Sequence, residues 1–372
     1  MRKAKRNPAV PVQAGLFGAE YDRKSRLLPL LEEQKDISYY AAPARNVLNG
    51  PETTGMDFWS LNPYTGCAFG CTYCYARYAH RYVMERASDA RRMEDPLAVR
   101  YEQMPAWLAF ERNIFVKTNA PELLSRALRH GSDKHKQLVN GATLLIGSAT
   151  DPYQPAERRF RVTRGVLEVL AMHPGLRIAI ITKSPLITRD IDLLTRISRH
   201  SELSVHISLI TLDRELARRL EPRSPTPESR VRALARLRAA GIEAGINCMP
   251  VLPGITDNPA DLDALVKRVA EAGATYVGAC ALRLRNSAKQ RYLPFIESEF
   301  PHLARSYRRT YGPGEHQAGE KYRAGLASFF ERTCARYGVR GTSRIRDDEE
   351  RDARPPGTMG ADMPQLELLT AT

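Results

Sequence analysis

The most informative segment of the chain reads Asn62-Pro63-Tyr64-Thr65-Gly66-Cys67-Ala68-Phe69-Gly70-Cys71-Thr72-Tyr73-Cys74-Tyr75. Its cysteines, Cys67, Cys71 and Cys74, follow the spacing C-x3-C-x2-C and make up half of the six cysteines in the chain. A structural zinc site usually has four protein ligands. A cubane iron–sulfur cluster held by three cysteines instead keeps one iron open for an exchangeable ligand. The spacing therefore predicts a [4Fe–4S] cluster on these three cysteines.

Two other interpretations of the triplet remain open at this point. One is a zinc site with a distant fourth ligand, for which His80 is the nearest histidine. The other is three unrelated buried cysteines. A tight cysteine triplet in a compartment that keeps thiols reduced favours a metal site over simple packing.

Composition sets the class of protein. The 372 residues are 43% hydrophobic, which is enough for a sizeable core. No apolar run approaches the ~18 residues that span a bilayer. The basic start Met1-Arg2-Lys3-Ala4-Lys5-Arg6 is not followed by the apolar region of a signal peptide. We therefore expect a cytoplasmic protein with no membrane association.

The net charge of +14 is unevenly distributed. The last 28 residues hold three basic and seven acidic side chains, so the rest of the chain is more basic still. A body this basic is consistent with binding DNA or RNA. The alternative is an arginine-rich protein with solvated side chains, and Arg230, Arg232, Arg236 and Arg238 fit the exposed face of one helix.

Short apolar runs alternate with helical patterns from residue 57 onward. This rhythm predicts an α/β fold with repeated β-α units and a parallel sheet. Six or seven units without a clear eighth predict an incomplete barrel. The expected strands are Phe58–Leu61, Ile114–Lys117, Thr143–Gly147, Arg177–Thr182, Ser204–Ile210, Glu243–Val251 and Thr275–Leu282.

The same rhythm sets the expected domain boundaries. We expect a basic, partly disordered arm over residues 1–50 and the partial barrel over 51–285. Residues 286–344 look helical and aromatic-rich, and we expect them to cap the open side of the barrel. Residues 345–372 read as a disordered acidic tail.

Polar side chains follow four of the expected strands. In barrels of this kind the loops after the strands carry the working residues. The run Ser148-Ala149-Thr150-Asp151-Pro152-Tyr153-Gln154-Pro155 follows one strand, and Thr182-Lys183-Ser184 follows the next. Ser208 and Asn247 lie at the ends of two later strands. Although Ser184 and Asp213 could be simple helix caps, the recurrence of polar groups predicts a shared ligand site.

The cysteine spacing, with Tyr73 just before the third cysteine, resembles that of the radical SAM enzymes. This resemblance implies S-adenosylmethionine (SAM) as a second cofactor, bound at the open iron. It also implies reductive cleavage of SAM to a 5′-deoxyadenosyl radical that abstracts a hydrogen atom. It implies as well a partial, TIM-like (β/α)6 barrel, the fold that the superfamily is known for, in agreement with the rhythm of the sequence.

Residues 62–257, about half the chain, are most similar to the spore photoproduct lyase-like branch. The similar motifs are Tyr73-Cys74-Tyr75, Thr182-Lys183, Ile207-Ser208, and Leu220-Glu221-Pro222 followed by Arg230. By this resemblance Thr150, Lys183 and Ser208 contact SAM, and Tyr73 and Tyr75 act in radical relay.

One position departs from the branch. Ser148 stands where the lyase has a hydrogen-donating cysteine, and an O–H bond is too strong for that task. Cys248 at the end of a later strand is the candidate replacement if its thiol points inward. Cys280, near the last expected strand, is a weaker candidate. For both, the alternative is a small buried apolar residue.

The sequence thus predicts a radical SAM enzyme of unknown substrate, with nucleic acid favoured over a protein or small metabolite. The resemblance to the branch implies a monomer. A reductant such as flavodoxin or ferredoxin is implied. The alternative from another class is a nucleic-acid-binding protein with a purely structural iron–sulfur or zinc site.

Overall fold

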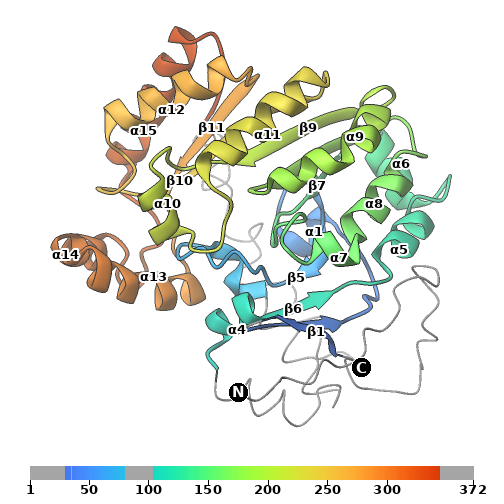
Figure 1. Ribbon diagram of the computed structural model, residues 1–372, viewed down its shortest axis with the longest axis horizontal. Coiled ribbons are helices and arrows are strands. Elements are labelled where there is room, and N and C mark those ends of the chain that lie inside the picture. The colour runs from blue at the N-terminus through green and yellow to red at the C-terminus, as the bar shows by residue number, and fades with distance from the viewer. Residues whose placement is uncertain (1–29, 35, 80–103, 344–372) are drawn as a thin grey trace, which may run out of the picture.

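The computed structural model describes residues 30–34, 36–79 and 104–343, which are coloured in Figure 1. His80, the first 29 residues of the predicted arm and the predicted acidic tail lie outside the described residues.

A curved eight-stranded sheet forms the body, in the order β12-β11-β10-β9-β8-β7-β4-β3. The pairs from β4 through β12 are parallel, and β3 joins the edge antiparallel to β4. The sheet does not close, which confirms the predicted partial barrel. Its strands are β3 (Leu48–Asn49), β4 (Trp59–Leu61), β7 (Thr143–Ile146), β8 (Arg177–Thr182), β9 (Glu202–Ser208), β10 (Glu243–Val251), β11 (Tyr276–Ala281) and β12 (Arg340–Ser343).

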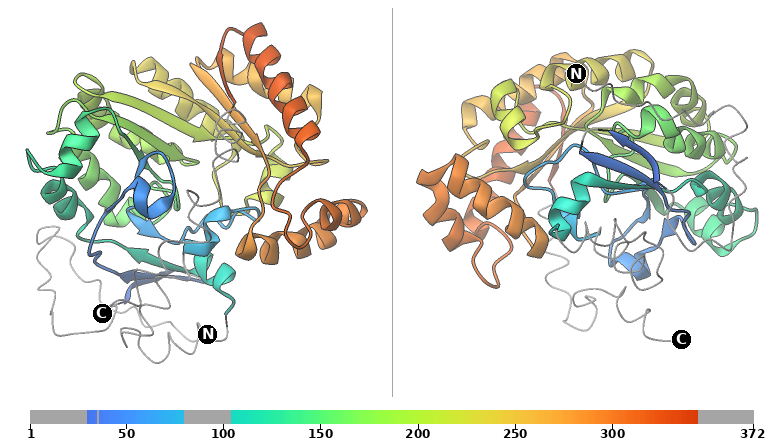
Figure 2. Two further views of the ribbon diagram at one scale, coloured as in Figure 1. Left: turned by 180° about the vertical axis from the view of Figure 1, so that it is seen from behind. Right: turned by 60° about the horizontal axis from the view of Figure 1, so that its bottom comes forward.

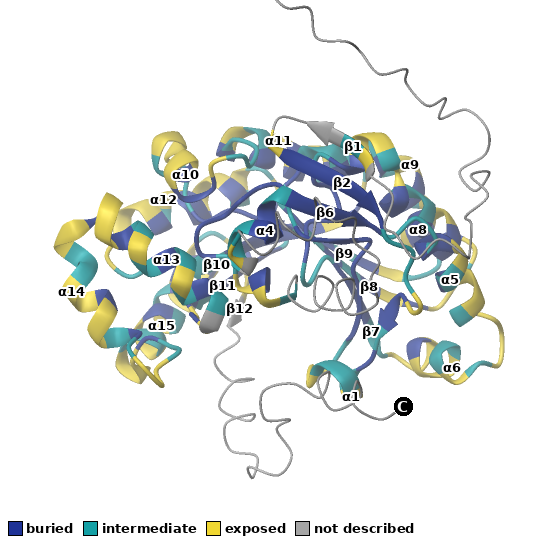
Figure 3. Ribbon diagram, turned by 90° about the horizontal axis from the view of Figure 1, so that it is seen from below, coloured by how far each residue is buried: buried dark blue, intermediate teal, exposed yellow. Residues whose placement is uncertain are grey.

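Helices cover the convex face of this sheet (Figures 1 and 2). In-register residues such as Ile180, Val205 and Ala244 are fully buried on that face, in one core with helix residues. Figure 3 shows the strands mostly buried and the outer sides of the helices exposed. The helices between residues 117 and 275 are α5 (Ala120–Ala127), α6 (Asp133–Val139), α7 (Glu157–Phe160), α8 (Val162–Leu170), η2 (Pro185–Asp190), α9 (Ile191–Ser198), α10 (Arg214–Leu220), α11 (Pro227–Ala239) and α12 (Pro259–Glu271).

The opposite, concave face is more polar. Ile181, His206, Gly245 and Tyr276 lie side by side across four strands. The Tyr276 ring crosses β10 to donate a hydrogen bond to the Val205 carbonyl oxygen, at 2.8 Å. This crossing requires Gly245, because a Cβ there would lie 2.6 Å from the tyrosine ring.

A second, four-stranded sheet corrects one strand prediction. The strand expected at Ile114–Lys117 exists as β6 (Asn113–Val116), but it belongs to the sheet β1-β2-β6-β5 and not to the barrel. It pairs parallel with β2 (Ile37–Ala41) and antiparallel with β5 (Tyr64–Thr65). All four β6 residues are buried, so its apolar pattern could not tell one sheet from the other.

The described end of the expected arm is therefore structured. β1 (Leu30–Gln34) pairs antiparallel with β2, and short α1 (Pro51–Thr54) follows β3. Tyr39 and Tyr40 on β2 are 1% and 6% exposed, and the Tyr39 ring lies 5.6 Å from that of Phe160. These tyrosines are packing residues of the small sheet.

Three helices follow the barrel, as the aromatic-rich pattern predicted. They are α13 (Asn286–Glu299), α14 (Pro301–Thr310) and α15 (Glu320–Arg336). The chain then returns to the large sheet as β12, parallel to β11, which the polar residues Arg340 to Ser343 gave no sign of. Within the described residues, no helix is long and apolar enough to cross a membrane.

Helix punctuation follows the sequence. Asn258 caps α12 by accepting from the amides of Ala260 and Asp261, at 2.9 and 3.3 Å. The interpretation of Ser184 and Asp213 as caps holds as well, since each accepts a backbone amide two residues ahead.

Candidate iron–sulfur and SAM site

The cysteine loop runs from Gly66 to Cys74, between β5 and the short helix η1 (Tyr75–Arg77). Gly66 has a φ of +88°, and a Cβ there would lie 2.9 Å from two backbone oxygens, those of Phe110 and Asn113. Only glycine fits both constraints. Beyond it, the Cys67 amide donates to the Phe110 oxygen and the Thr72 amide to the Leu220 oxygen, both at 2.9 Å.

Side chains from the end of β7 hold the same loop. The Ala68 amide donates to Gln154 Oε1 at 3.0 Å, and Gln154 Nε2 donates to the Gly66 oxygen at 3.0 Å. Thr150 Oγ1 also donates to the Gly66 oxygen, at 2.6 Å. The polar segment that follows β7, predicted from the sequence, therefore lies next to the cysteines. The Thr150 hydroxyl already donates its hydrogen bond to the loop backbone.

The three thiols are close enough to influence one another. Burial raises the pKa of Cys67 well above its usual range, and Asp151, Cys71 and Cys74 add to the effect. Burial likewise raises the pKa of Cys71 to about 12, which the Lys183 charge opposes. Cys71 is buried, whereas Cys67 and Cys74 are half-buried.

The thiols suit a cluster better than a single ion. Among the described residues, no three histidine, cysteine or carboxylate groups converge closely enough to hold one metal ion. A cubane cluster instead binds each thiolate to a different iron, which allows wider spacing. The donor set, three free cysteines on one pinned loop, fits such a cluster.

Lys183 and Ser208 lie side by side on the concave face. Thr182 pairs with Ile207 in register, so the residue after each of them projects from the opposite face of the sheet. The Lys183 amide is fixed by Asp151 Oδ2 at 2.7 Å. Its ammonium lies 5.8 Å from the centre of the Tyr73 ring. Burial lowers the pKa of Lys183, but the interactions with Cys71 and the Glu221 carboxylate raise it more, so that it lies above its usual value.

A buried carboxylate joins these groups. Glu221 is 2% exposed, accepts from the Tyr73 hydroxyl and from Arg230, and lies 3.7 Å from Lys183 Nζ. Burial alone would raise the pKa of Glu221, but the charges of Arg230 and Lys183 hold it below the usual value.

Arg230 corrects a prediction. It was expected on a solvated helix face, yet it is 1% exposed and donates to the Ser208 oxygen at 3.0 Å. It belongs to the buried stripe of α11 with Val231 and Leu234.

The two tyrosines predicted for radical relay differ in their surroundings. Tyr73 is buried, and burial together with Glu221 raises the pKa of its phenol well above the usual range. Tyr75 is 55% exposed, and its hydroxyl donates to the Ser148 oxygen. The Ser148 hydroxyl in turn accepts from Asn62 Nδ2 at 3.0 Å.

Cys248 does not meet the condition set for its role as the replacement donor, an inward thiol, and fits the alternative of a small buried residue. It lies two residues after Ile246, on the face that packs against the helices, and it is fully buried. Burial raises the pKa of its thiol, and Cys280 and Cys334 add to the effect. Alternation along β11 instead places Cys280 on the same concave face as Tyr276.

Two arginines of the site gave no signal in the sequence. Arg77 is completely buried, and its Nη2 donates to the Cys71 oxygen at 2.6 Å. Arg223 Nε donates to the Ala68 oxygen at 2.6 Å. Both act on backbone oxygens, which any residue supplies, so no pattern of side chains could have identified them.

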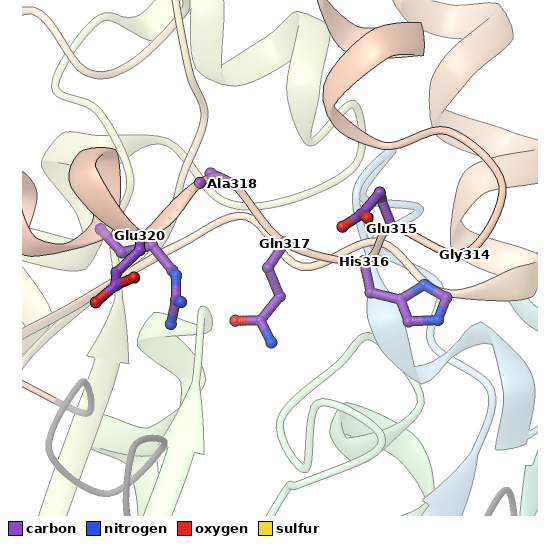
Figure 4. Close-up of a pocket in the computed structure, with 8 residues that line it drawn as sticks. Gly314, Glu315, His316, Gln317, Ala318 and Glu320 are labelled. Atoms are coloured by element: carbon purple, nitrogen blue, oxygen red, sulfur yellow. The ribbon is translucent and has the colours of Figure 1, made fainter. Parts of the chain in front are cut away.

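A separate hollow of about 340 Å³ is lined by the segment that connects α14 to α15 and by the start of α15. Figure 4 shows Gln317 and His316 projecting from the same side of this segment. Gln317 bridges to Arg283, just beyond β11, which ties the hollow to the barrel. None of the predicted site residues lines it.

Comparisons with known proteins agree with this geometry. Residues 61–268 match the profile of the Radical SAM superfamily. An uncharacterised protein of Mycobacterium tuberculosis (strain ATCC 25618 / H37Rv) is 31% identical, over 86% of this chain and 87% of its own length. An uncharacterised protein of Methanocaldococcus jannaschii is 28% identical over 58% of this chain and 68% of its own.

Among solved structures, spore photoproduct lyase complexed with dinucleoside spore photoproduct has a similar fold. The TM-score is 0.56 at 14% identity, covering 82% of each chain. At this identity the likeness concerns the fold.

Proposed function

The chain belongs to the radical SAM superfamily, and we propose that it holds a [4Fe–4S] cluster on Cys67, Cys71 and Cys74 and uses it to cleave SAM reductively. Membership makes the protein an enzyme of the radical SAM type and implies an iron–sulfur cluster and SAM as cofactors. When bound, the cluster supplies the electron that breaks the sulfonium C–S bond, and the resulting 5′-deoxyadenosyl radical takes a hydrogen atom from the substrate.

The observation that carries the proposal is the position of Lys183. Its ammonium shares the Cys71 thiol and Glu221 as electrostatic partners. A cation so placed would offset the charge of any thiolate-bound metal site, and it would also pair with an amino-acid carboxylate bound beside the cysteines. Ser208, next to Lys183 on the same face, would bind a polar group of SAM.

Thr150 supports the site differently. Its hydroxyl proton already goes to the Gly66 oxygen, so its proposed contribution is to fix the loop and to accept from a SAM donor. Glu221 would keep Lys183 charged and hold the Tyr73 ring against it.

For the chemistry beyond SAM we propose radical relay through Tyr75, with Tyr73 as a buried second member. Tyr75 is the more accessible phenol, and its hydroxyl already touches the strand-end loop at Ser148. Cys248 is not part of this proposal, because its thiol faces the helices.

The proposed substrate is nucleic acid, supported by the net charge of +14. The proposed setting is a cytoplasmic monomer served by a protein reductant such as flavodoxin or ferredoxin. All six cysteines are free thiols, which agrees with a reducing compartment.

A spectroscopic experiment tests the cofactor assignment. The protein is reconstituted anaerobically with iron and sulfide, reduced, and examined by EPR with and without SAM. The proposal predicts about four irons per chain and a signal that SAM alters. Lys183→Ala should keep the signal but lose the SAM effect, and Lys267→Ala, an exposed control on α12, should keep both. Zinc in place of iron would favour the structural-site alternative.

A further inference from the structure

Four arginines from separate segments gather on the outer side of the cysteine loop. Arg77 and Arg223 both approach the Glu111 carboxylate, at 2.9 and 3.8 Å. Arg112, at the end of α4 (Ala106–Arg112), shares Asp36 with Arg223. The fourth, Arg291 of α13, is close enough for Arg77, Arg223 and Glu111 to influence its charge.

Two of these arginines touch the loop that would hold the cluster. Arg77 and Arg223 bind the Cys71 and Ala68 oxygens, each at 2.6 Å. A Cβ on Gly70 would lie 2.7 Å from Arg223 Nη2. The guanidinium of Arg223 therefore lies directly against the loop backbone, and 29% of its side chain still reaches solvent.

Positive charge is in excess here. Among the described residues, the carboxylates paired with the four guanidiniums are Glu111 and Asp36. Burial and the Arg223 charge both lower the pKa of Arg112. Burial also lowers the pKa of Arg291, where the Arg77 and Arg223 charges counteract Glu111. An anion binding here would relieve this repulsion.

Among the four arginines, Arg291 has a guanidinium with hydrogen-bond donors still available for a binding partner. Within the described part of the chain it has no hydrogen bond or ion pair, and its Nε is buried without an acceptor. Its guanidinium lies 5.6 Å from the centre of the Trp107 ring and 6.0 Å from that of Phe295. The rings hold it in place while leaving its donors unused. Arg112 has 27% of its side chain exposed nearby.

We propose that Arg112, Arg223 and Arg291, the arginine face, form the docking surface for an acidic one-electron carrier protein. This inference rests on the proposed function, which requires an electron to reach the cysteine loop. One electron passes from the reduced carrier to the oxidised cluster, the carrier is oxidised by one electron, and no bond forms or breaks. Redox partners meet through small surfaces, and complementary charge raises their association rate.

The test compares two reductants on the reconstituted full chain. Flavodoxin hydroquinone is the acidic protein donor, and reduced methyl viologen, a small cation, is the control donor. Loss of the cluster absorbance is followed by anaerobic stopped flow. Arg112→Glu and Arg291→Gln should each slow reduction by flavodoxin roughly tenfold. Reduction by viologen should not slow, and raising the salt concentration should slow only the flavodoxin reaction of the parent protein.

Two matched variants complete the design. Arg291→Lys keeps the charge and should keep most of the rate. Arg199→Gln, exposed at the end of α9, removes an arginine elsewhere and should change nothing. Equal flavodoxin rates in the parent, Arg112→Glu and Arg291→Gln proteins would overturn the proposal. If the flavodoxin rates are equal but the two variants no longer bind an oligonucleotide, the proposal is also overturned and the arginine face is assigned to nucleic acid. A parent protein that assembles no iron–sulfur cluster on reconstitution would instead refute the proposed function itself.

Discussion

The carboxylate of Glu221 and the guanidinium of Arg230 form an ion pair that is sealed from solvent, with side-chain exposures of 0% and 1%. The pair connects α11 to the segment that follows α10, directly beneath Tyr73. Because Arg230 also donates to the Ser208 oxygen, this one pair fixes groups on both sides of the proposed SAM site.

Removing one member of the pair should destabilise the protein strongly. Arg230→Met leaves Glu221 as a buried charge near Lys183 alone, and breaking a buried pair costs about 3–5 kcal/mol. Denaturant unfolding of the two proteins measures the difference. The exposed pair Arg177 and Glu202 is the control, and Arg177→Gln should have no measurable effect. Equal unfolding midpoints for Arg230→Met and the parent would show that the pair is not structural.

Lys183 should decide SAM affinity without deciding cluster assembly. Losing a charge-assisted hydrogen bond costs about 1.5–3 kcal/mol. Lys183→Ala should therefore weaken SAM binding roughly 10- to 100-fold in equilibrium dialysis. Iron content should stay unchanged. Parent-like affinity in this variant would remove Lys183 from the SAM site.

Gly66 should be required for cluster assembly. Gly66→Ala forces a Cβ to within 2.9 Å of two backbone oxygens, so the loop must shift and iron content after reconstitution should fall. Gly141→Ala is the matched control, since Gly141 also has a positive φ, +98°, but a Cβ added there would meet no atom within 4 Å. Any difference between the variants reports the clash and not the backbone strain. Equal iron in both would argue that the loop tolerates a side chain.

Cys248→Ser should affect stability and not chemistry. A hydroxyl placed in the apolar core at this fully buried site costs about 1–3 kcal/mol. Formation of 5′-deoxyadenosine from SAM should persist at the parent rate, measured below the temperature at which the variant unfolds. A stable variant that forms no deoxyadenosine would return Cys248 to the site.

The sequence predicted the barrel well, because most of its strands carry an apolar run and several of its helices, such as α11 and α12, begin at a side-chain cap. Asn258 and Pro259 mark the start of α12 in the sequence as clearly as in the structure. The assignment of β6 to a second sheet was out of reach, because strand pairing is a long-range choice that local pattern does not encode. β12 was missed for the opposite reason, since its four residues have no apolar pattern.

The site divides along similar lines. Side-chain motifs indicated Lys183, Ser208 and the cysteines, and in the structure Lys183 is close enough to Cys71 for each to shift the pKa of the other. Arg77 and Arg223 act through backbone oxygens, and their roles depend on where distant segments meet. Cys248 is the small buried residue of the alternative interpretation, because it continues the alternation of Ala244 and Ile246 along β10.

Cleavage of SAM through a cluster on the three cysteines is the proposal on which the others depend. The decisive measurement is anaerobic formation of 5′-deoxyadenosine from SAM by the reconstituted, dithionite-reduced protein, quantified by chromatography beside Cys71→Ala. The proposal predicts deoxyadenosine from the parent protein and none from the variant. Equal amounts of deoxyadenosine from both proteins would contradict it. So would a parent protein that contains four irons and changes its EPR signal on binding SAM but forms no deoxyadenosine even when DNA or RNA is added.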